Sequence, residues 1–252
     1  MIDKNLIALA LAEDLQGGVD VTSVSTIAAD ATSIADFTAR KAGVLAGIEL
    51  VKAVLEEVGL TEIAIKKHDG DAISAGEVLL TVSGNTRAIL FAERTALNFV
   101  GHLSGIATET SKWVAAVAGT QCKVRDTRKT TPGYRQLEKY AVRMGGGTNH
   151  RMSLSDAALI KDNHIAAAGG IAAVLKAARA SVSHMMKVEI EVDTMAQMAE
   201  VLAVGGADVV LLDNMDTPTL RQAVGMVAGR LVTEASGNMA LPRIAEVAAT
   251  GV

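Results

Sequence analysis

The sequence has little cysteine and few aromatic residues, and each shortage excludes a class of protein. Cys122 is the only cysteine among 252 residues, so no internal disulfide can form, and no CxxC or HExxH spacing is present for zinc. Three Phe, two Tyr and one Trp leave the core mainly to Ala, Val, Leu, Ile and Met. No uninterrupted apolar run reaches about 18 residues, so we expect no membrane span. The lone cysteine favours a reducing, cytoplasmic location.

Basic residues are concentrated in one stretch of an otherwise acidic chain. Between Lys123 and Arg151 there are eight basic and two acidic residues, a net charge of +6, whereas the whole chain carries −4. A cationic stretch of this kind favours a small anionic ligand over a long polyanion, so we expect no nucleic-acid partner. Some of these residues recur at helical spacing and suit a solvated helix face, but Arg125, Arg128 and Lys129 cluster in a non-helical stretch.

The apolar pattern predicts two domains. Residues 1–115 combine alternating strands with helices and include most of a long helix from about residue 86 to 118, interrupted by Gly101 and Gly105. They predict an N-terminal α+β sandwich domain with a bridging helix. Residues 116–252 alternate short apolar strands with helices, which predicts a parallel sheet, either doubly wound or closed into a barrel. Five strands are expected there, at residues 122–126, 157–162, 186–192, 207–213 and 231–236.

Charged or polar residues follow every one of these strands. One such residue is explained as the cap of the next helix, but five in succession favour a barrel, whose active site lies at the carboxyl ends of its strands. The resulting mouth would hold several cations and two carboxylates: Arg125, Arg128, Lys129, Arg151, Lys161, Glu191 and Asp213. The cations suggest a ligand with several anionic groups. The carboxylates could hold Mg²⁺ or stabilise a developing positive charge, and the combination fits transfer from a sugar pyrophosphate.

Two glycine-containing segments add anion-binding character. GGGTNHR (residues 145–151) follows a helix, and Gly145 alone is equally well explained as the C-cap of that helix. Three glycines followed by Asn-His-Arg favour an anion-binding loop. ASGN (residues 235–238) follows the last strand and resembles a phosphate nest at a helix start.

Eight motifs resemble those of the quinolinate phosphoribosyltransferases, in the order and spacing of that family, from about Glu13 to the C-terminus. The combination of RDTRKT, GGGxNHR and IKDNH makes the match highly specific. The motifs are ERTALN (93–98), GHLSGIAT (101–108), RDTRKTTPG (125–133), KYAVRMGGGTNHR (139–151), DAALIKDNH (156–164), VEIEVD (188–193), LLDN (211–214) and EASGN (234–238).

The resemblance implies a fold, a reaction and a set of site residues. The fold is an N-terminal α/β sandwich followed by an open, TIM-like parallel α/β barrel, in a homodimer or hexamer. The reaction joins quinolinate to phosphoribosyl pyrophosphate with Mg²⁺, giving nicotinate mononucleotide, pyrophosphate and CO₂ for de novo NAD biosynthesis. The implied catalytic residues are Lys129, Lys161, Glu191 and Asp213, the last two also near the metal. The implied substrate-binding residues are Thr127, Arg128, His150, Arg151, Ser236, Gly237, Asn238, and Arg94 lent to the neighbouring subunit's site.

Two alternatives remain open. The first is a paralogue with another substrate, associated with molybdate transport or specific for nicotinate. The four cations Arg128, Lys129, Arg151 and Lys161 favour a dicarboxylate and therefore quinolinate. The second alternative is a shortened, catalytically impaired binding protein, since five predicted strands fall short of the family's seven. We therefore expect the barrel to be truncated at its C-terminal end.

Overall fold

The computed structural model describes residues 3–252, which form two compact units. The first unit runs to Ser111 and also takes in Thr130–Thr148, and the second comprises Lys112–Lys129 and Asn149–Val252. The first contains α1 (Lys4–Leu15), α2 (Val21–Thr26), β1 (Thr32–Thr38), β2 (Gly43–Val44), α3 (Ile48–Glu57), β3 (Glu62–Ile65), β4 (Ala72–Ile73), β5 (Val78–Asn85), most of α4 (Thr86–Ala116), and α5 (Arg135–Met144). The second contains β6 (Ala158–Ile160), α6 (Asp162–Ala168), α7 (Ile171–Ser181), β7 (Val188–Val192), α8 (Met195–Val204), β8 (Val209–Asp213), α9 (Thr217–Val227), β9 (Val232–Ser236) and α10 (Leu241–Ala248).

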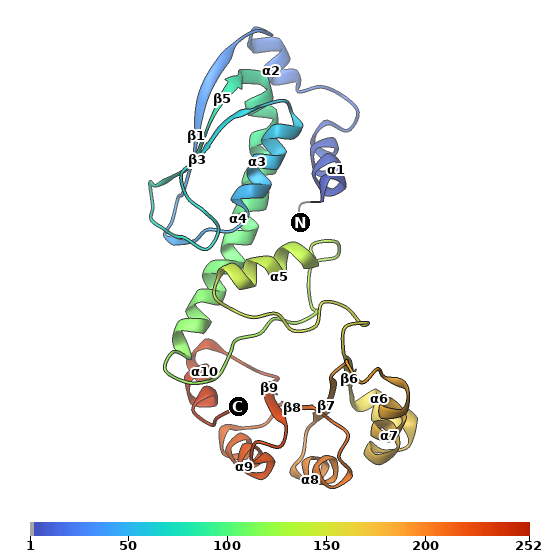
Figure 1. Cartoon of the computed structure of the whole chain (residues 1–252). Coiled ribbons are helices and arrows are strands. Elements are labelled where there is room, and N and C mark those ends of the chain that lie inside the picture. The colour runs from blue at the N-terminus through green and yellow to red at the C-terminus, as the bar shows by residue number, and fades with distance from the viewer. Residues whose placement is uncertain (1–2) are drawn as a thin grey trace. The chain divides into compact units, whose positions relative to one another are not determined.

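The first unit packs helices against a small antiparallel sheet. The strand order is β1-β5-β3, and α3 and α4 lie along one face of this sheet (Figure 1). The apolar stripe of α3 is fully buried in the core at Ile48, Val51 and Leu55. Helix α5 is grouped with this unit, although the sequence pattern places it within residues 116–252, because Ala141 and its apolar neighbours pack into the same core. The predicted α+β architecture is confirmed.

The long helix is confirmed, but its glycines do not interrupt it. Helix α4 is continuous over 31 residues and passes through Gly101 and Gly105. A glycine inside a helix costs about 0.5–1 kcal/mol relative to alanine. Burial of side chains such as Leu103 and Ala107 on the core-facing side offsets this cost and keeps the helix whole.

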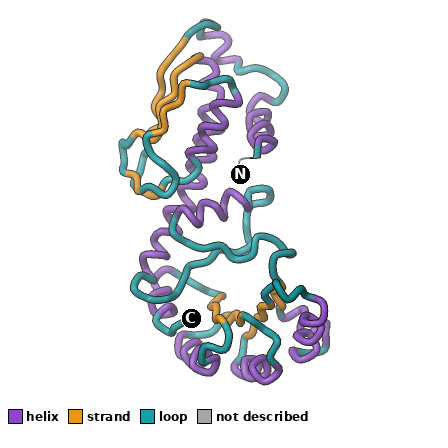
Figure 2. Tube along the Cα trace, viewed as in Figure 1, coloured by secondary structure: helices purple, strands orange, loops and turns teal. Residues whose placement is uncertain are grey.

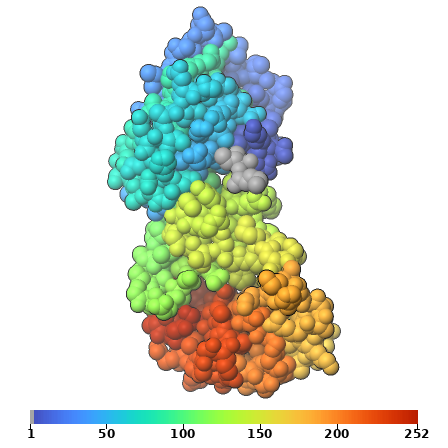
Figure 3. Space-filling view, in the orientation of Figure 1, coloured from blue at the N-terminus to red at the C-terminus, as the bar shows by residue number. Residues whose placement is uncertain are grey.

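The second unit contains a four-stranded parallel sheet of order β6-β7-β8-β9. Helices α6–α9 cover one face of it, whereas loop segments cross the other (Figure 1 and Figure 2). Apolar side chains from strands and helices form the core between the layers, among them Ile190, Leu212 and Leu220. Figure 3 shows that α7, α8 and α9 form a continuous outer surface. This parallel α/β arrangement confirms the predicted fold class.

The first predicted strand, at residues 122–126, is wrong. Only Arg125 makes an isolated bridge, and the segment is not part of the sheet. Its apolar residues Cys122 and Val124 instead pack with the cluster that includes Ile244 of α10. Asp126 uses its carboxylate to bind a neighbouring loop. Side-chain contacts, rather than a strand ladder, therefore hold this segment. Across residues 3–252, none of the helices is both long enough and apolar enough to cross a membrane.

Candidate functional site

The parallel sheet has one apolar face and one charged face. Strand residues alternate between the two faces, so the neighbours of a buried side chain point the other way. On β7, Ile190 is fully buried among the helices, whereas Glu189 and Glu191 flank it. The same alternation places Asp213 of β8 and Glu234 of β9 on the charged face. A row of carboxylates on the inner face of a parallel sheet is costly unless cations or ligands compensate it, which marks this face as a functional site.

A carboxylate cluster, Glu191, Asp193 and Asp213, lies at the carboxyl ends of β7 and β8. Carboxylate oxygens of all three lie within 4.8 Å of one another. Nζ of Lys161, the residue after β6, lies 2.6 Å from Oε2 of Glu191. An all-oxygen set of this kind suits Mg²⁺, and the adjacent ammonium suits a phosphate or carboxylate oxygen.

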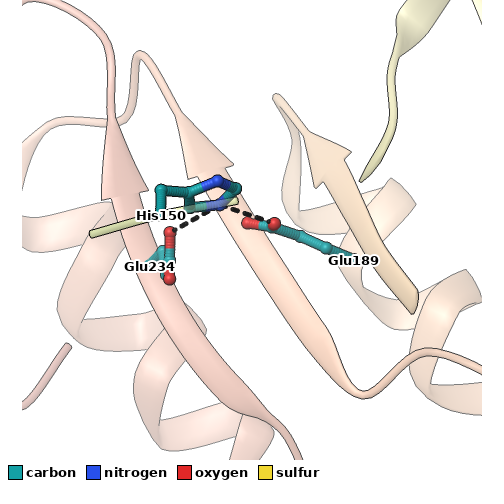
Figure 4. Close-up of side chains that lie close together, drawn as sticks. All are labelled: His150, Glu189 and Glu234. Atoms are coloured by element: carbon teal, nitrogen blue, oxygen red, sulfur yellow. Dashed lines mark hydrogen bonds and ion pairs between the residues drawn. The ribbon is translucent and has the colours of Figure 1, made fainter. Parts of the chain in front are cut away.

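A second group, the histidine cluster, consists of His150, Glu189 and Glu234. Nε2 of His150 lies 2.9 Å from Oε2 of Glu189 and 3.5 Å from Oε2 of Glu234 (Figure 4). Nε of Arg125 lies 3.4 Å from Oε1 of Glu234. The hydrogen bond with Glu189 raises the pKa of His150, against the effect of burial. Burial, followed by the charge of Glu189, raises the pKa of Glu234.

Asp126 holds the loop that carries His150. Its Oδ1 accepts a hydrogen bond from the backbone N–H of His150 at 2.9 Å, and its Oδ2 accepts one from the side chain of Asn149. Nη1 of Arg151 donates to the carbonyl of Ala157 at 2.9 Å. These bonds fix the backbone of residues 149–151 and so direct the His150 ring towards the sheet.

Two guanidinium groups lie near each other beside the sheet. Burial, and then the charge of Arg128, lower the pKa of Arg151. Both side chains are half-buried. Two guanidinium groups that influence each other in this way are suited to an anion with more than one charged oxygen, because guanidinium groups bind carboxylate and phosphate bidentately.

The loops after β8 and β9 are bound to each other through Asn214. Its backbone N–H donates to the carbonyl of Ser236 at 3.0 Å, and its Oδ1 accepts from Nδ2 of Asn238 at 3.0 Å. Its Nδ2 donates to Oδ2 of Asp213 at 2.6 Å. The position of Asp213 in the carboxylate cluster is therefore coupled to the ASGN segment.

Family models and individual relatives agree on the family to which the whole chain is similar. The model of the quinolinate phosphoribosyl transferase C-terminal domain matches residues 106–252, and that of the N-terminal domain matches residues 20–104. The chain belongs to the quinolinate phosphoribosyltransferase family. It is 43% identical, over 99% of its length and 89% of the relative's, to a nicotinate-nucleotide pyrophosphorylase (carboxylating) from Mycobacterium leprae.

Solved structures of the quinolinate phosphoribosyltransferase family show the same fold. The nicotinate-nucleotide pyrophosphorylase of Francisella tularensis superimposes with a TM-score of 0.93 at 39% identity, covering 98% of this chain and 87% of that one. NadC from Streptococcus pyogenes gives a TM-score of 0.91 at 40% identity, covering 96% and 85%.

The second unit contains all but one of the residues assigned from the family resemblance. The exception is Arg94, which is exposed on α4 in the first unit. Among the others, contacts join Lys161 to Glu191, and Asn238 and Ser236 to the loop after β8. The residues placed in the second unit are Thr127, Arg128, Lys129, His150, Arg151, Lys161, Glu191, Asp213, Ser236, Gly237 and Asn238. Their separate roles remain predictions.

Sequence reasoning placed Asp193 and Glu234 among the polar residues at the strand ends without giving them a role at the site, and it missed Glu189. The signal was present in VEIEVD, where acidic residues recur at every second position of a strand that is otherwise apolar. Glu234 lies in the same cross-strand row as Glu191, with Leu211 of β8 between them. Its proximity to His150 depends on the loop at residues 149–151, which no strand pattern reveals.

Gly145 and Gly147 lie in close packing contacts at the end of α5. Gly145 is the C-cap of α5, and a Cβ there would lie 2.7 Å from Cβ of Thr110 and against the carbonyl of Ala107 on α4. At Gly147 a Cβ would lie 2.8 Å from Cγ1 of Val142. These two glycines therefore permit close contact between α5 and α4.

Replacing Gly237 by alanine is expected to weaken binding of phosphoribosyl pyrophosphate. Gly237 has φ +77°, and a Cβ there would lie 2.6 Å from Cγ and 2.8 Å from the backbone nitrogen of Asn214. The left-handed backbone costs alanine about 1–2 kcal/mol, and the clash must displace Asn214, so KM for this substrate should rise about tenfold. Gly229→Ala is the matched control, because Gly229 has φ +75° and nothing lies within 4 Å of its Cβ position. Equal KM values for the two variants would contradict the expectation.

Proposed function

We propose that this protein transfers the phosphoribosyl group of phosphoribosyl pyrophosphate to quinolinate with decarboxylation, giving nicotinate mononucleotide, pyrophosphate and CO₂ for de novo NAD biosynthesis. The observation that carries the proposal is the carboxylate cluster beside Lys161 in the same unit as Arg128 and Arg151. Such a site accommodates both a polyanionic donor and a dicarboxylate acceptor. The carboxylating relatives at about 40% identity support the same reaction. A cytoplasmic location is part of the proposal, supported by the single cysteine, Cys122.

The transfer step requires stabilisation of positive charge on the ribose. The pyridine nitrogen of quinolinate forms a bond to the anomeric carbon, while the bond from that carbon to pyrophosphate breaks with its electron pair. The carbon passes through an oxocarbenium-like state, and the fixed carboxylates of Glu191 and Asp213 stabilise its charge. Lys161 sits beside Glu191 and is placed to orient a carboxylate or phosphate oxygen.

The decarboxylation step uses the charge created by the transfer. The ring nitrogen is now positively charged, so it withdraws the electron pair left when the adjacent carbon–carboxylate bond breaks. CO₂ departs, and the ring carbon takes a proton. Arg128, Arg151 and the two lysines, Lys129 and Lys161, orient the two carboxylates of the substrate. The departing carboxylate leaves this cationic site as neutral CO₂.

Glu191, Asp193 and Asp213 fit a magnesium site. Their oxygens lie within 4.8 Å of one another, and oxygen ligands with open positions for phosphate are what Mg²⁺ prefers. Bound there, the ion would neutralise negative charge on the pyrophosphate leaving group. The carboxylate of Glu191 also pairs with Lys161, which holds that lysine beside the cluster.

The reaction is tested on the purified full chain with phosphoribosyl pyrophosphate and carboxyl-labelled quinolinate, with and without Mg²⁺. We expect labelled CO₂ and pyrophosphate in equal amounts, and no product with nicotinate as acceptor. Product from nicotinate without CO₂ would indicate the nicotinate-specific alternative. Ligand binding without any product in either arm would indicate a binding protein.

We propose further that the active unit is a homodimer or larger homo-oligomer in which Arg94 reaches the neighbouring subunit's site. Arg94 is exposed on α4, and the apolar residues Leu90 and Leu97, on either side of it along the same helix face, are also exposed, at 39% and 37%. An apolar stripe around an exposed arginine is typical of an interface between copies.

Mixing two inactive variants tests the shared site. We expect Arg94→Ala and Lys161→Ala each to be inactive alone. After co-refolding of equal amounts, statistical pairing in a two-fold dimer should restore roughly one quarter of wild-type activity, because half of the dimers then contain one intact site. No recovery in mixtures that form dimers would contradict the sharing of Arg94.

A further inference from the structure

The loop after β8 turns at Asn214, an exposed residue with a left-handed backbone. Its φ is +54°, a conformation that glycine adopts freely and that asparagine and aspartate tolerate better than other residues. Asp213, the residue before it, belongs to the carboxylate cluster, and Met215, the residue after it, is buried. An exposed side chain contributes little to the core, and the proposed function gives Asn214 no role. A left-handed residue beside a site residue is a candidate for a part in the mechanism.

We propose that Asn214 is a positioning residue for the donor substrate. Its side-chain amide joins Asp213 to the ASGN segment (residues 235–238), so that one hydrogen-bonded unit binds both the ribose and the phosphate of phosphoribosyl pyrophosphate. The inference rests on the proposed function for the identity of the donor. It deepens that function by assigning the residue that holds these two parts of the site together.

The two neighbours of the Asn214 amide require opposite hydrogen-bonding groups. The ionised carboxylate of Asp213 can only accept, so Nδ2 of Asn214 faces it, 2.6 Å from Oδ2. On the other side, Nδ2 of Asn238 donates to Oδ1 of Asn214 at 3.0 Å. A primary amide supplies a donor and an acceptor on one short planar group. Glycine and aspartate, the other residues suited to this backbone, cannot make both bonds.

Gly237 leaves the space in which the Asn214 side chain lies. A Cβ at residue 237 would lie 2.6 Å from Cγ of Asn214 and 2.8 Å from its backbone nitrogen. The amide group of Asn214 therefore packs directly against the backbone of the ASGN segment. This close contact connects the segment predicted to bind phosphate with the carboxylate that stabilises charge on the ribose.

Other bonds hold the backbone of the two loops. The N–H of Asn214 donates to the carbonyl of Ser236 at 3.0 Å, and Nη2 of Arg243 on α10 donates to the carbonyl of Met215 at 2.7 Å. Replacing the Asn214 side chain leaves both of these bonds in place. Since glycine adopts the left-handed backbone without strain, Asn214→Gly removes the amide group and should preserve the course of the loop.

Calorimetry of donor binding, with Mg²⁺ and without quinolinate, tests the link apart from turnover. We expect the dissociation constant for phosphoribosyl pyrophosphate to rise about tenfold in Asn214→Gly, because hydrogen bonds to charged groups are among the stronger ones. Ala228→Gly is the matched control, since Ala228 is also exposed and has φ +48°. The control should bind the donor as the wild type does. A wild-type dissociation constant in Asn214→Gly would overturn the proposal.

A double-mutant cycle tests whether Asn214 acts through Asp213. In the Asp213→Ala background, the change Asn214→Gly should raise the dissociation constant by less than about threefold, because the partner is already absent. A tenfold rise in both backgrounds would show that the two residues act independently, which would refute the link.

Asn214→Asp separates the two bonds of the amide. Aspartate still offers an acceptor to Asn238, but it cannot donate to Asp213 and places a second negative charge beside it. We expect this variant to bind the donor no better than Asn214→Gly does. Wild-type affinity in Asn214→Asp would show that the bond to Asn238 alone matters and would overturn the proposal.

Kinetics report the effect on the transfer step. In Asn214→Gly we expect kcat to fall about tenfold, since Asp213 loses the bond that orients it, while KM for quinolinate changes less than about twofold. A merely structural role would loosen the site as a whole. Equal rises in the KM values of both substrates with an unchanged kcat would therefore refute a positioning role.

The binding and kinetic tests separate the inference from the function on which it rests. If the donor binds but quinolinate is not converted, the proposed function fails, and the calorimetric cycle still decides whether Asn214 joins Asp213 to the ASGN segment. If quinolinate is converted and Asn214→Gly matches the wild type in affinity and kcat, the function stands and only the inference fails. Absence of donor binding by the wild type would overturn both.

Discussion

Replacing Lys161 by alanine is expected to lower kcat by about 10²–10³-fold, the usual loss when one oriented charge at a reacting centre is removed. Its Nζ lies 2.6 Å from Oε2 of Glu191 in the carboxylate cluster. Removing the ammonium leaves that carboxylate without its counter-charge and removes a contact for the substrate anions. The measurement is steady-state CO₂ release at saturating concentrations of both substrates. Lys129→Ala, at an exposed residue of the same cationic stretch, is expected to give a loss of similar size.

The fold should survive the Lys161 substitution. The Lys161 side chain is 46% exposed, so its loss creates no cavity, and the melting temperature should stay close to that of the wild type. Lys176→Ala, at an exposed lysine on α7, is the control and should keep full activity. A folded Lys161→Ala protein with near-normal kcat would remove this lysine from the mechanism.

Replacing Gly145 by alanine is expected to destabilise the first unit by about 1–3 kcal/mol, the range found for overpacked cores. The new Cβ would lie 2.7 Å from Cβ of Thr110 and against the backbone carbonyl of Ala107. A helix backbone cannot rotate away as a side chain can, so α5 must shift from α4. Differential scanning calorimetry should show a melting temperature lower by about 3–10 °C.

Gly225→Ala separates the clash from the general effect of adding a methyl group. Gly225 lies inside α9, and nothing lies within 4 Å of its Cβ position. Alanine is the better helix former by about 0.5–1 kcal/mol, so this variant should melt at or slightly above the wild-type temperature. If Gly145→Ala behaved in the same way, the close packing of α5 on α4 would not contribute to stability.

Periodicity predicted the elements in which one physical signal dominates. The apolar stripe of α3 and the long pattern of α4 were recognisable because each helix buries one face. The strands β6, β7, β8 and β9 were recognisable because parallel strands covered by helices are short apolar runs between helices. The pattern failed at residues 122–126, where alternation exists but Asp126 and Val124 make loop and helix contacts instead of a ladder.

Some features of the functional site were likewise predictable from sequence patterns, and others were not. Polar residues at strand ends predicted Lys161, Glu191 and Asp213, because the ends of parallel strands meet at one edge whatever the details of packing. The glycines of the GGGTNHR segment were ambiguous in sequence, since glycine also ends helices and permits close helix packing. Gly145 shows the second use, with the backbone of α4 against it.

Residue order and chemistry alone therefore identify the family, most of the strands and helices in their order, and several of the cationic and acidic groups that meet at the site. Tertiary structure decides which carboxylate faces which cation. Glu189 and His150 are 39 residues apart, and Asp126 holds the backbone of the loop that brings them within 2.9 Å of each other at β7. A contact of that kind depends on a loop backbone held by side-chain hydrogen bonds. Such geometry has no sequence period, so only the folded chain reveals it.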